Sequence, residues 1–484
     1  MLIGREREKS QILELYESKQ AEFLALYGRR RVGKTVLVRE SFISCDSLYF
    51  ELTGQKKMKL AKQLSNFVKA YQKTFYPKLK IMPPKTWSEA FGMLTDAINK
   101  TDKKVVIFLD ELPWLAGRKS NLMSALDYVW NTEWVKCPRV KLIVCGSAAS
   151  WMIKHIISDK GGLHNRTTDT MLLKPFTLTE TKYFLAEKNI TLSLIQILQI
   201  YMTMGGIPYY LNLIKSGKSA TEIISTLCFQ ENGLLFNEFD KLFDSLFDDS
   251  EVYKEIIRIV ASKRYGIEKR NLLKQAKFST SGGRFNVRLN ELVEAGFIKR
   301  MIQNKKNEEY YRIIDEYSYF YLKWILPMKD QLLLDNVNQY WQLQMQTSSW
   351  KSWAGYTFET ICLKHANKLI EKLELSSLVI GAIPWRFISN KNPNENESNG
   401  AQIDLILQRN DGSVTLCEIK FNLKEIIIDK TFRANLLNKV AAYRKTTKID
   451  EHVFIVMVTC AGVKKNNYAK ELLADQLVLA DLFE

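Results

Sequence analysis

The first residues with an evident chemical use form a glycine-rich loop. The apolar run Phe23–Tyr27 leads into this loop, and the helix-like stretch VLVRESF follows it. The spacing GxxxxGK[ST] lies in the strand–loop–helix context that a phosphate-binding loop needs. Backbone N–H groups would surround the β-phosphate of ATP, and the helix N-terminus favours negative charge there. We expect Lys34 to act on the β- and γ-phosphates and Thr35 to hold Mg²⁺. The residues predicted to contact ATP are Gly28, Arg29, Arg30, Arg31, Val32, Gly33, Lys34 and Thr35.

Two other polar positions follow strands of the buried type. Residues 105–109 are apolar and end in Asp110 and Glu111, and residues 142–146 end in Ser147. Open α/β sheets bind their ligands at the carboxyl ends of the strands. We therefore expect Asp110 to bind Mg²⁺ through water, Glu111 to polarise the attacking water, and Ser147 to sense the γ-phosphate. A serine at a strand end is common, so Ser147 gains meaning only from the two motifs beside it.

A second chemical cluster lies near the C-terminus. Residues 401–407 and 414–420 predict a β-hairpin that carries the pattern D…ExK as Asp404, Glu418 and Lys420. This pattern resembles the PD-(D/E)xK core of restriction-endonuclease-like domains. The resemblance implies that Asp404 and Glu418 hold one or two Mg²⁺. It also implies that Lys420 orients the water or stabilises charge on the scissile phosphate.

Two flanking helices add candidates to this cluster. The helix expected over residues 355–362 resembles the GxxxE helix of such nucleases, which implies that Glu359 adds a metal ligand or holds the metal-bound water. The basic helix expected over residues 432–444 places Lys439 and Tyr443 on one face, where they could contact DNA phosphates. The alternative is a nuclease-like fold that no longer cleaves and serves DNA binding or assembly.

The register of the hairpin decides whether these side chains meet. A two-residue turn would pair residue 404 with residue 419, and Asp404 would then point to the opposite face from Glu418 and Lys420. A three-residue loop at 410–412 pairs 404 with 418 instead, so that all three side chains share one face. Its sequence, Asn-Asp-Gly, is typical of a type I turn followed by a glycine in the left-handed region. We predict the three-residue loop.

Helices and strands must position these groups. The sequence pattern divides the chain into four regions. Residues 1–175 alternate β-like apolar runs with helical stretches, which predicts an α/β core with a parallel sheet. Residues 176–245 look all-helical, residues 246–325 predict short helices followed by a hairpin, and residues 340–484 return to mixed α and β structure. No linker, low-complexity tract or repeat is visible, so we expect these regions to pack directly on one another.

The third region suggests a winged helix-turn-helix. Phe285, Leu289 and Leu292 follow the helical period and mark the core face of a candidate recognition helix. The exposed face and the wing would carry basic residues that bind DNA phosphates and release counterions. The alternative is a winged helix used only for packing within the molecule. The predicted DNA contacts are Arg284, Arg288, Lys299, Arg300, Lys305 and Lys306.

Together the motifs of the first half resemble archaeal and bacterial AAA+-type P-loop ATPases close to the signal-transduction NTPases. Gly4-Arg5-Glu6 is similar to the GRE box of that family, and GGIPYYL at 205–211 is similar to its GGxPxYL signature in a helical lid. The resemblance implies that Arg5 and Pro208 lie near the nucleotide. Arg166 lies where the family has Tyr-Gly-Arg, but His and Asn precede it here. It is therefore either a sensor or a surface arginine.

Composition sets broader limits. Of 484 residues, 46% are hydrophobic, which excludes a disordered chain, and the net charge of +17 points to a polyanion such as nucleic acid. Residues 251–300 hold 12 basic and 5 acidic residues. Residues 51–100 hold 10 and 3, which indicates either a second DNA-facing surface or a solvated helix. Seven scattered cysteines without a CxxC pair suit a reducing cytoplasm. No apolar run reaches the roughly 18 residues of a membrane span.

The expected fold is therefore a multidomain α/β chain. It combines an AAA+-like P-loop core, a helical lid, a winged helix and a restriction-endonuclease-like domain, and nearly the whole chain resembles a fused type of this kind. The favoured function is an ATP-hydrolysing, DNA-interacting switch or motor with ATP and Mg²⁺ as cofactors, and a homo-oligomer is compatible with it. The second hypothesis is a nucleotide-gated signalling or scaffold protein with an inactive nuclease-like domain. A third is an accessory protein of transposition or defence.

Overall fold

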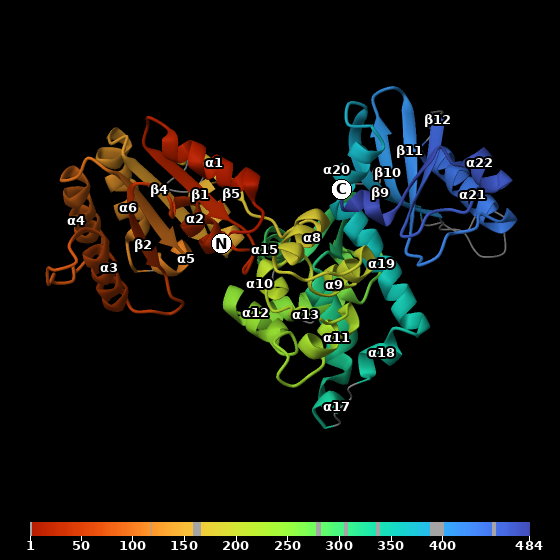
Figure 1. Ribbon diagram of the computed structural model, residues 1–484, viewed down its shortest axis with the longest axis horizontal. Coiled ribbons are helices and arrows are strands. Elements are labelled where there is room, and N and C mark those ends of the chain that lie inside the picture. Colours follow the sequence, from red (N-terminus) through yellow and green to blue (C-terminus); the bar gives the residue numbers. More distant parts are fainter. Residues whose placement is uncertain are drawn as a thin grey trace.

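The computed structural model describes residues 2–117, 119–157, 166–276, 282–303, 308–334, 339–387, 401–447 and 452–484. Figure 1 shows an N-terminal α/β lobe, a largely helical central body and a C-terminal α/β lobe. The central body lies between the two α/β lobes, so it can contact both. No helix in the described ranges has the length and apolar character that crossing a membrane requires.

The N-terminal lobe is built on a five-stranded parallel sheet, as the alternation of apolar runs and helices predicts. Its strand order is β2-β3-β4-β1-β5. Successive residues serve opposite faces, because Phe23 belongs to one hydrophobic core and Leu24 to another. Helices therefore cover both faces of this sheet. The strands are β1 (Glu22–Tyr27), β2 (Ser47–Thr53), β3 (Lys104–Asp110), β4 (Val140–Gly146) and β5 (Asp169–Leu172).

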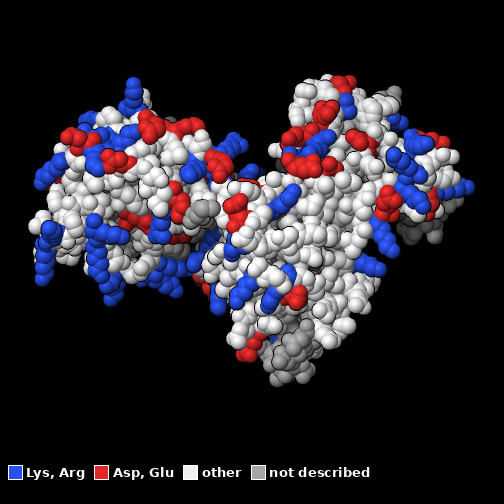
Figure 2. All heavy atoms as spheres, viewed as in Figure 1, with Lys and Arg blue, Asp and Glu red and all other residues white. Residues whose placement is uncertain are grey.

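The helices of this lobe bury one side and expose lysines on the other. In α3, Leu64, Phe67 and Tyr71 are buried, while Lys62 and Lys69 are exposed. Figure 2 shows Lys and Arg gathered along the outer edge of the lobe, where α3 and α4 lie. The basic excess of residues 51–100 is thus exposed, as both a DNA-facing surface and a solvated helix require. The helices are α1 (Glu6–Glu17), α2 (Lys34–Phe42), α3 (Leu60–Phe75), α4 (Trp87–Asn99), α5 (Leu112–Leu115), α6 (Leu122–Thr132) and α7 (Ala149–Met152).

Helices alone make up the next region. α8 begins at a capping box formed by Thr177 and Glu180, which satisfies two backbone donors at the helix start. After α9 the chain must pass very close to another backbone, since a Cβ at Gly206 would lie 1.9 Å from the carbonyl oxygen of Phe176. This contact explains the second glycine of the GGIPYYL motif. The helices are α8 (Leu178–Glu187), α9 (Leu194–Met204), α10 (Pro208–Leu211), α11 (Ala220–Cys228) and α12 (Glu238–Leu246).

A compact unit of helices and a small antiparallel sheet follows. The sheet has the order β6-β8-β7. Phe285, Leu289 and Leu292 of α15 are almost fully buried, as their helical spacing predicts. The same helix packs against α7 of the N-terminal lobe. The elements are α13 (Ser250–Ala261), β6 (Ile267–Glu268), α14 (Lys269–Gln275), α15 (Gly282–Glu294), β7 (Ile298–Gln303) and β8 (Glu308–Ile313).

Three short helices, α16 (Glu316–Phe320), α17 (Lys329–Leu334) and α18 (Tyr340–Gln344), lead to the C-terminal lobe. Its sheet has the order β13-β12-β11-β10-β9, in which β10 is antiparallel to both of its neighbours and β12 is parallel to both of its neighbours. The elements are α19 (Ser348–Lys364), α20 (Ala366–Lys372), β9 (Val379–Phe387), β10 (Ala401–Arg409), β11 (Ser413–Lys420), α21 (Lys430–Thr447), β12 (His452–Thr459), α22 (Asn467–Leu472) and β13 (Asp475–Leu477).

The hairpin of β10 and β11 has the predicted register. Leu405 pairs with Cys417 and Gln408 pairs with Val414, which brings residue 404 opposite residue 418. The loop is the three-residue segment 410–412, and Gly412 has a φ of 73°. The left-handed glycine is the feature that favours this loop over a two-residue turn.

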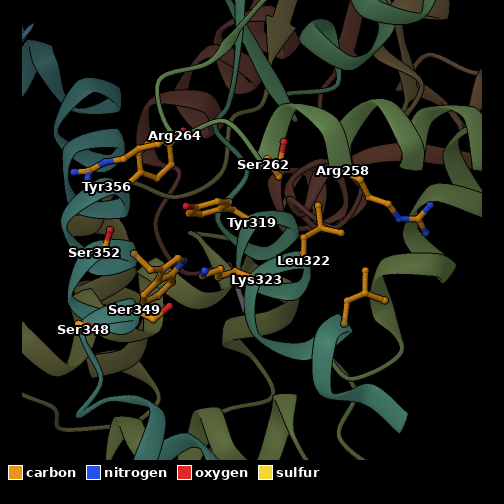
Figure 3. Close-up of a pocket in the computed structure, with 13 residues that line it drawn as sticks. Arg258, Ser262, Arg264, Tyr319, Leu322, Lys323, Ser348, Ser349, Ser352 and Tyr356 are labelled. Carbon is orange, nitrogen blue, oxygen red and sulfur yellow. The ribbon is translucent and has the colours of Figure 1, made fainter. Parts of the chain in front are cut away.

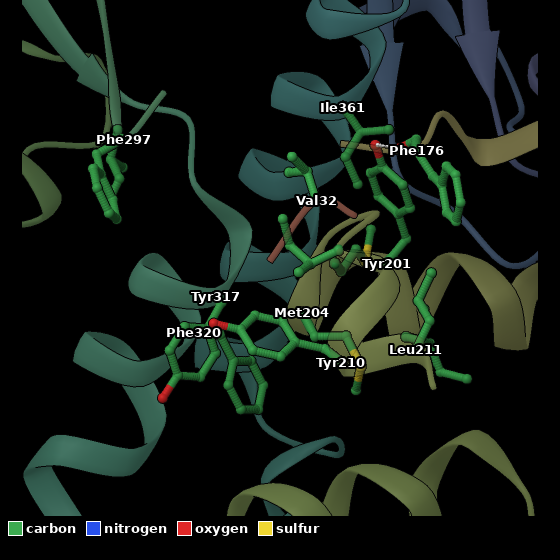
Figure 4. Close-up of a cluster of buried hydrophobic side chains, with 14 of the residues drawn as sticks. Val32, Phe176, Tyr201, Met204, Tyr210, Leu211, Phe297, Tyr317, Phe320 and Ile361 are labelled. Carbon is green, nitrogen blue, oxygen red and sulfur yellow. Dashed lines mark hydrogen bonds between the residues drawn. The ribbon is translucent and has the colours of Figure 1, made fainter. Parts of the chain in front are cut away.

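One hydrophobic core joins the phosphate-binding loop to the rest of the molecule. Figure 4 shows Val32 of that loop near Phe176 and Tyr201. The same cluster includes Tyr317 of α16 and Ile361 of α19. The loop therefore shares one packed core with elements of both the central body and the C-terminal lobe.

Candidate functional sites

The phosphate-binding loop lies between β1 and α2 and depends on its glycines. Gly28 has a φ of 145°, and a Cβ there would lie 2.3 Å from the carbonyl oxygen of Leu173. Gly33 has a φ of 94°, which also favours glycine. The ammonium of Lys34 donates to the carbonyl oxygens of Gly28 and Arg29, each at 2.9 Å. A phosphate entering the loop would compete with these carbonyls for Lys34.

A hydroxyl and a carboxylate meet beside this loop. Thr35 Oγ1 donates to Asp110 Oδ2 at 2.8 Å. Burial raises the pKa of Asp110, although its bond from Thr35 opposes the shift. Hard oxygen donors in contact suit Mg²⁺, so the residues fit the predicted magnesium site. When bound, the ion would neutralise phosphate oxygens of ATP.

Glu111 and Ser147 also lie together, at the ends of β3 and β4. Glu111 has a φ of 50°, which turns its side chain toward the neighbouring strand. Its Oε2 accepts hydrogen bonds from the backbone N–H of Ser147 at 3.1 Å and from the hydroxyl of Ser147 at 2.9 Å. The hydroxyl of Ser147, predicted to sense the γ-phosphate, thus also holds the carboxylate expected to polarise the attacking water.

Two arginines of the loop turn away from the phosphate side. Arg29 forms a buried ion pair with Asp315, and its guanidinium lies 5.0 Å from the centroid of the Phe297 ring. Arg31 forms an ion pair with Glu238. Their side chains join the loop to the central body, which leaves their backbone N–H groups as the predicted ATP contacts. A buried guanidinium requires a carboxylate partner, and the central body supplies one to each. Arg30 is half-buried.

The family resemblance places two further residues, Arg5 and Pro208, near the nucleotide. Arg5 donates from Nη2 to the carbonyl oxygen of Lys174 at 2.6 Å and stacks 4.5 Å from the centroid of the Phe176 ring. It thus ties the N-terminus to the segment that enters the helical region. Pro208 is the first residue of α10. Arg166 is exposed in a turn before β5, and residues 158–165 lie outside the described residues.

In the C-terminal lobe, the predicted carboxylates and lysine converge. Asp404 and Glu418 are both buried, and Asp404 Oδ2 accepts the backbone N–H of Ile419 at 2.9 Å. Lys420 Nζ lies 2.6 Å from Glu418 Oε1 and 3.7 Å from Asp404 Oδ2, so it lies between the two carboxylates. Lys439 of α21 donates to both oxygens of Glu418, at 2.7 and 2.6 Å. Lys439, which could contact DNA phosphates by its place on this helix, neutralises Glu418 in the structure.

The carboxylate pair has the donors that a magnesium ion takes. Burial raises the pKa of Asp404 to about 6, and the negative charges of Glu418 and Glu359 act in the same direction. A nearby cation would therefore favour the ionised form. In the described part of the chain, no group of three or more His, Cys, Asp or Glu side chains could hold a metal. Magnesium is usually held by one or two carboxylates together with water and substrate phosphate, so the pair fits an ion that the substrate completes.

Glu359 is held by a residue that the sequence does not single out. Arg312 of β8 donates to Glu359 Oε1 at 2.8 Å, to Tyr356 OH at 3.0 Å and to Thr360 Oγ1 at 2.8 Å. Both charged side chains are buried. The predicted role of Glu359 as a metal ligand is thus in competition with a buried ion pair to the central body. The strand-like pattern of residues 311–313 gives no sign of this partner.

The residues predicted to contact DNA differ in their surroundings. Arg284 and Lys299 are exposed. Arg288 pairs with Asp249 at 3.1 Å, and Arg300 lies 3.4 Å from Glu309. Lys305 and Lys306 lie outside the described residues. Because α15 packs against α7 of the N-terminal lobe, a duplex cannot reach all of its surface in this arrangement.

The family comparison bears on the first half of the chain, and the other comparisons extend beyond it. Residues 2–214 match a family model described as an ATPase domain predominantly from Archaea. An uncharacterized protein of Methanocaldococcus jannaschii is 26% identical over 445 residues, which cover 90% of each chain. Among solved structures, a Walker-type ATPase of Pyrococcus abyssi is 20% identical with a TM-score of 0.48, and the match covers 66% of this chain and 96% of that chain.

A signal-transduction ATPase with numerous domains and a tetratricopeptide repeat sensor, from Pyrococcus horikoshii, is also similar. It is 19% identical with a TM-score of 0.30, and the match covers 77% of this chain and 50% of that chain. The matched range contains Lys34, Thr35 and Asp110, whose side chains form the predicted phosphate and magnesium site. Residues 2–214 are therefore similar to an archaeal ATPase domain and form a P-loop ATPase core.

Proposed function

We propose that this ATPase is a nucleotide-gated switch that acts on DNA through a Mg²⁺-dependent nuclease-like site at Asp404, Glu418 and Lys420. One observation carries the proposal. The short segment from Arg312 to Asp315 contacts the phosphate-binding loop through Asp315 and the helix beside the carboxylate pair through Arg312. Two sites far apart in sequence thus share one connecting segment.

The connection is built from buried charges, which tolerate few arrangements. Asp315 also accepts the backbone N–H of Ser318 at 2.8 Å and so begins α16. The backbone N–H groups of Ile314 and Asp315 both donate to the carbonyl oxygen of Phe297. A shift of Arg29 on nucleotide binding would leave Asp315 buried without its cation, which is costly. The segment would then move, and Arg312 would carry that movement to Glu359.

The modules of the proposal follow the pattern of the sequence. We assign residues 1–175 to the ATPase core, 176–245 to a helical lid, 246–325 to a winged helix and 340–484 to a nuclease-like domain. The order of helices and the hairpin in the third unit supports the winged helix, and the exposed Arg284 and Lys299 are its accessible DNA contacts. Packing of α15 on α7 would limit duplex binding until the switch opens.

The experiment is a DNA-nicking assay on supercoiled plasmid with Mg²⁺ or Mn²⁺ and with ATP, ADP or neither. The wild type should nick in a nucleotide-dependent manner, and Asp404→Ala should abolish nicking while ATP hydrolysis continues. Asp315→Asn, which keeps the shape of the side chain and removes its charge, should make nicking independent of nucleotide. If wild type never nicks DNA under any of these conditions, the cleavage part of the proposal is wrong.

A second candidate is a nucleotide-gated signalling or scaffold ATPase without cleavage. The contacts of Lys439 with both oxygens of Glu418 favour it, since these contacts compensate the carboxylate without a metal. This candidate predicts that Asp404→Ala leaves every DNA-dependent property unchanged. Nucleotide would then alter partner binding rather than cleavage.

A further inference from the structure

A deep hollow lies next to the carboxylate pair, in the central body. It has a volume of about 790 Å³ and lies between α13, the segment after α16 and the first turns of α19. Figure 3 shows Arg264 and Tyr356 at one end, Arg258 at the other, and Tyr319 and Lys323 between them. Among the described residues, none of the predicted ATP, metal or DNA contacts lines this hollow.

The hollow is positively charged. Arg258, Arg264 and Lys323 line it, and its described lining includes no Asp or Glu. Arg258 has only a loose pair with Glu255, at 3.5 Å, and neither Arg264 nor Lys323 has an ion pair within the described residues. Three cations facing one concave space without carboxylates repel one another, and an anion bound there relieves that repulsion.

Hydroxyl and aromatic groups complete the lining. Ser348, Ser349 and Ser352 of α19 are exposed along one wall and can donate to phosphate oxygens. The rings of Tyr319 and Tyr356 lie 5.0 Å apart at 59°. Trp353 also lines the hollow, and its indole N–H has no acceptor among the described residues although the side chain is 3% exposed. Buried donors of this kind normally have a partner.

The hollow continues toward the carboxylate pair. A second cavity of about 800 Å³ is lined by Asp404, Glu418 and Lys420, and Arg264 lines both cavities. Helix α19 forms a shared wall, because Lys351 and Glu359 line the second cavity from the same helix. A chain of phosphates lying in the first cavity would therefore lead into the proposed magnesium site.

We propose that this hollow binds the sugar-phosphate backbone of a single-stranded nucleic acid and leads the strand to Asp404 and Glu418. Cations spaced along a groove, with aromatic rings among them, are the features by which proteins bind single strands without reading sequence. A mononucleotide would not span two adjacent cavities, and an acidic peptide would not use the half-buried ring of Tyr319. The inference deepens the proposed DNA-directed role but does not require that the site cleaves.

The test measures binding of a short fluorescent oligothymidylate to the full-length chain in EDTA, without nucleotide. Arg264→Ala combined with Lys323→Ala should weaken binding. Loss of two phosphate contacts should also make the slope of log K against log salt shallower by about 1.4. The matched control is Lys215→Ala with Lys218→Ala, which removes two exposed lysines between α10 and α11 and should change neither quantity.

Folding and specificity are checked in the same series. Unchanged ATP hydrolysis by the double variant shows that it is folded, and Arg264→Lys with Lys323→Arg should restore the slope. Unchanged affinity and slope in the alanine variant would overturn the proposal. So would equal losses for the oligothymidylate and for a duplex of the same length. Nicking activity is measured separately, so a failure of cleavage does not affect this result.

Discussion

The phosphate-binding loop and the C-terminal carboxylate pair are made of similar groups, yet they are held in different ways. In the loop, Lys34 bonds to two carbonyl oxygens of its own loop, and Thr35 bonds to Asp110 at the end of β3. In the C-terminal lobe, Glu418 is held by Lys439, which lies 21 residues along the chain on a different helix. The first site is organised mainly by its own backbone and the second mainly by side chains.

This difference determines how each site can respond to its ligand. A site whose lysine rests on carbonyl oxygens can exchange them for phosphate oxygens, because both are acceptors of the same kind. A site whose carboxylates are neutralised by lysines and Arg312 must lose those partners before a metal can bind the carboxylate oxygens. The first is therefore organised for its ligand, and the second depends on changes elsewhere in the molecule.

The largest expected effect breaks one site and leaves the other intact. Lys34→Ala removes the ammonium that would act on the β- and γ-phosphates, and ATP hydrolysis should fall by about 10³-fold or more. Binding of Mn²⁺ to the C-terminal site, followed by electron paramagnetic resonance, should be unchanged. Asp404→Asn should give the opposite pattern. A variant that impairs both properties equally would show that the two sites are not separately organised.

The next effect concerns the buried ion pair of Arg312 and Glu359, which connects the central body to the helix beside the carboxylate pair. Arg312→Ala leaves Glu359 buried without its cation and should lower the free energy of unfolding by about 3–5 kcal/mol, as breaking a buried pair does. Chemical denaturation measures this loss. The double variant Arg312→Met with Glu359→Leu should recover much of it, because apolar side chains fill the same space. The surface pair of Arg39 and Glu51 is the control, since its removal should cost under about 1 kcal/mol.

The two sites also differ in how far sequence alone predicts them. The loop, its strand and its helix are contiguous, so spacing and apolar patterning define them together. The D…ExK hairpin is also local, and its glycine at 412 fixes the register that brings Asp404 and Glu418 together. Local pattern therefore predicts the backbone of both sites.

Partners from distant segments are what the sequence does not reveal. Nothing in the pattern around Arg312 distinguishes an exposed strand residue from one that is buried against Glu359. The same holds for the side chain of Arg29, whose place in the loop gives no sign that it pairs with Asp315, 286 residues away. Such pairs depend on how whole regions pack, which a short window does not contain.

A third effect uses pH to test the contact between α19 and α8. His365 accepts the backbone N–H of Leu178 through Nε2 at 3.2 Å, and its Nδ1–H donates to the carbonyl oxygen of Ile361 at 2.8 Å, so the neutral ring links α19 to α8. Burial lowers the pKa of His365 from 6.5 to about 4. Between these values the unfolded chain binds more protons than the folded one. Stability should therefore fall as pH decreases from about 6.5 to 4, by up to about 3 kcal/mol.

The control for this titration is His365→Gln, whose amide oxygen can still accept the N–H of Leu178 but does not titrate. Denaturant midpoints measured at several pH values should fall less steeply for this variant than for wild type. Parallel profiles would mean that His365 contributes nothing to the acid sensitivity.

The smallest effect separates the two lysines beside Glu418. Lys439 occupies both oxygens of Glu418, so it competes with a metal for them, and Lys439→Ala should strengthen Mn²⁺ binding by about fivefold, or ~1 kcal/mol. Lys420→Ala should also strengthen metal binding but abolish any nicking, because Lys420 is the group proposed to stabilise charge on the scissile phosphate. Isothermal titration with Mn²⁺ and the nicking assay together distinguish the two. If Lys439→Ala weakens metal binding instead, Lys439 holds Glu418 in its binding position. Both sites would then be organised before their ligands arrive, and the contrast between them would disappear.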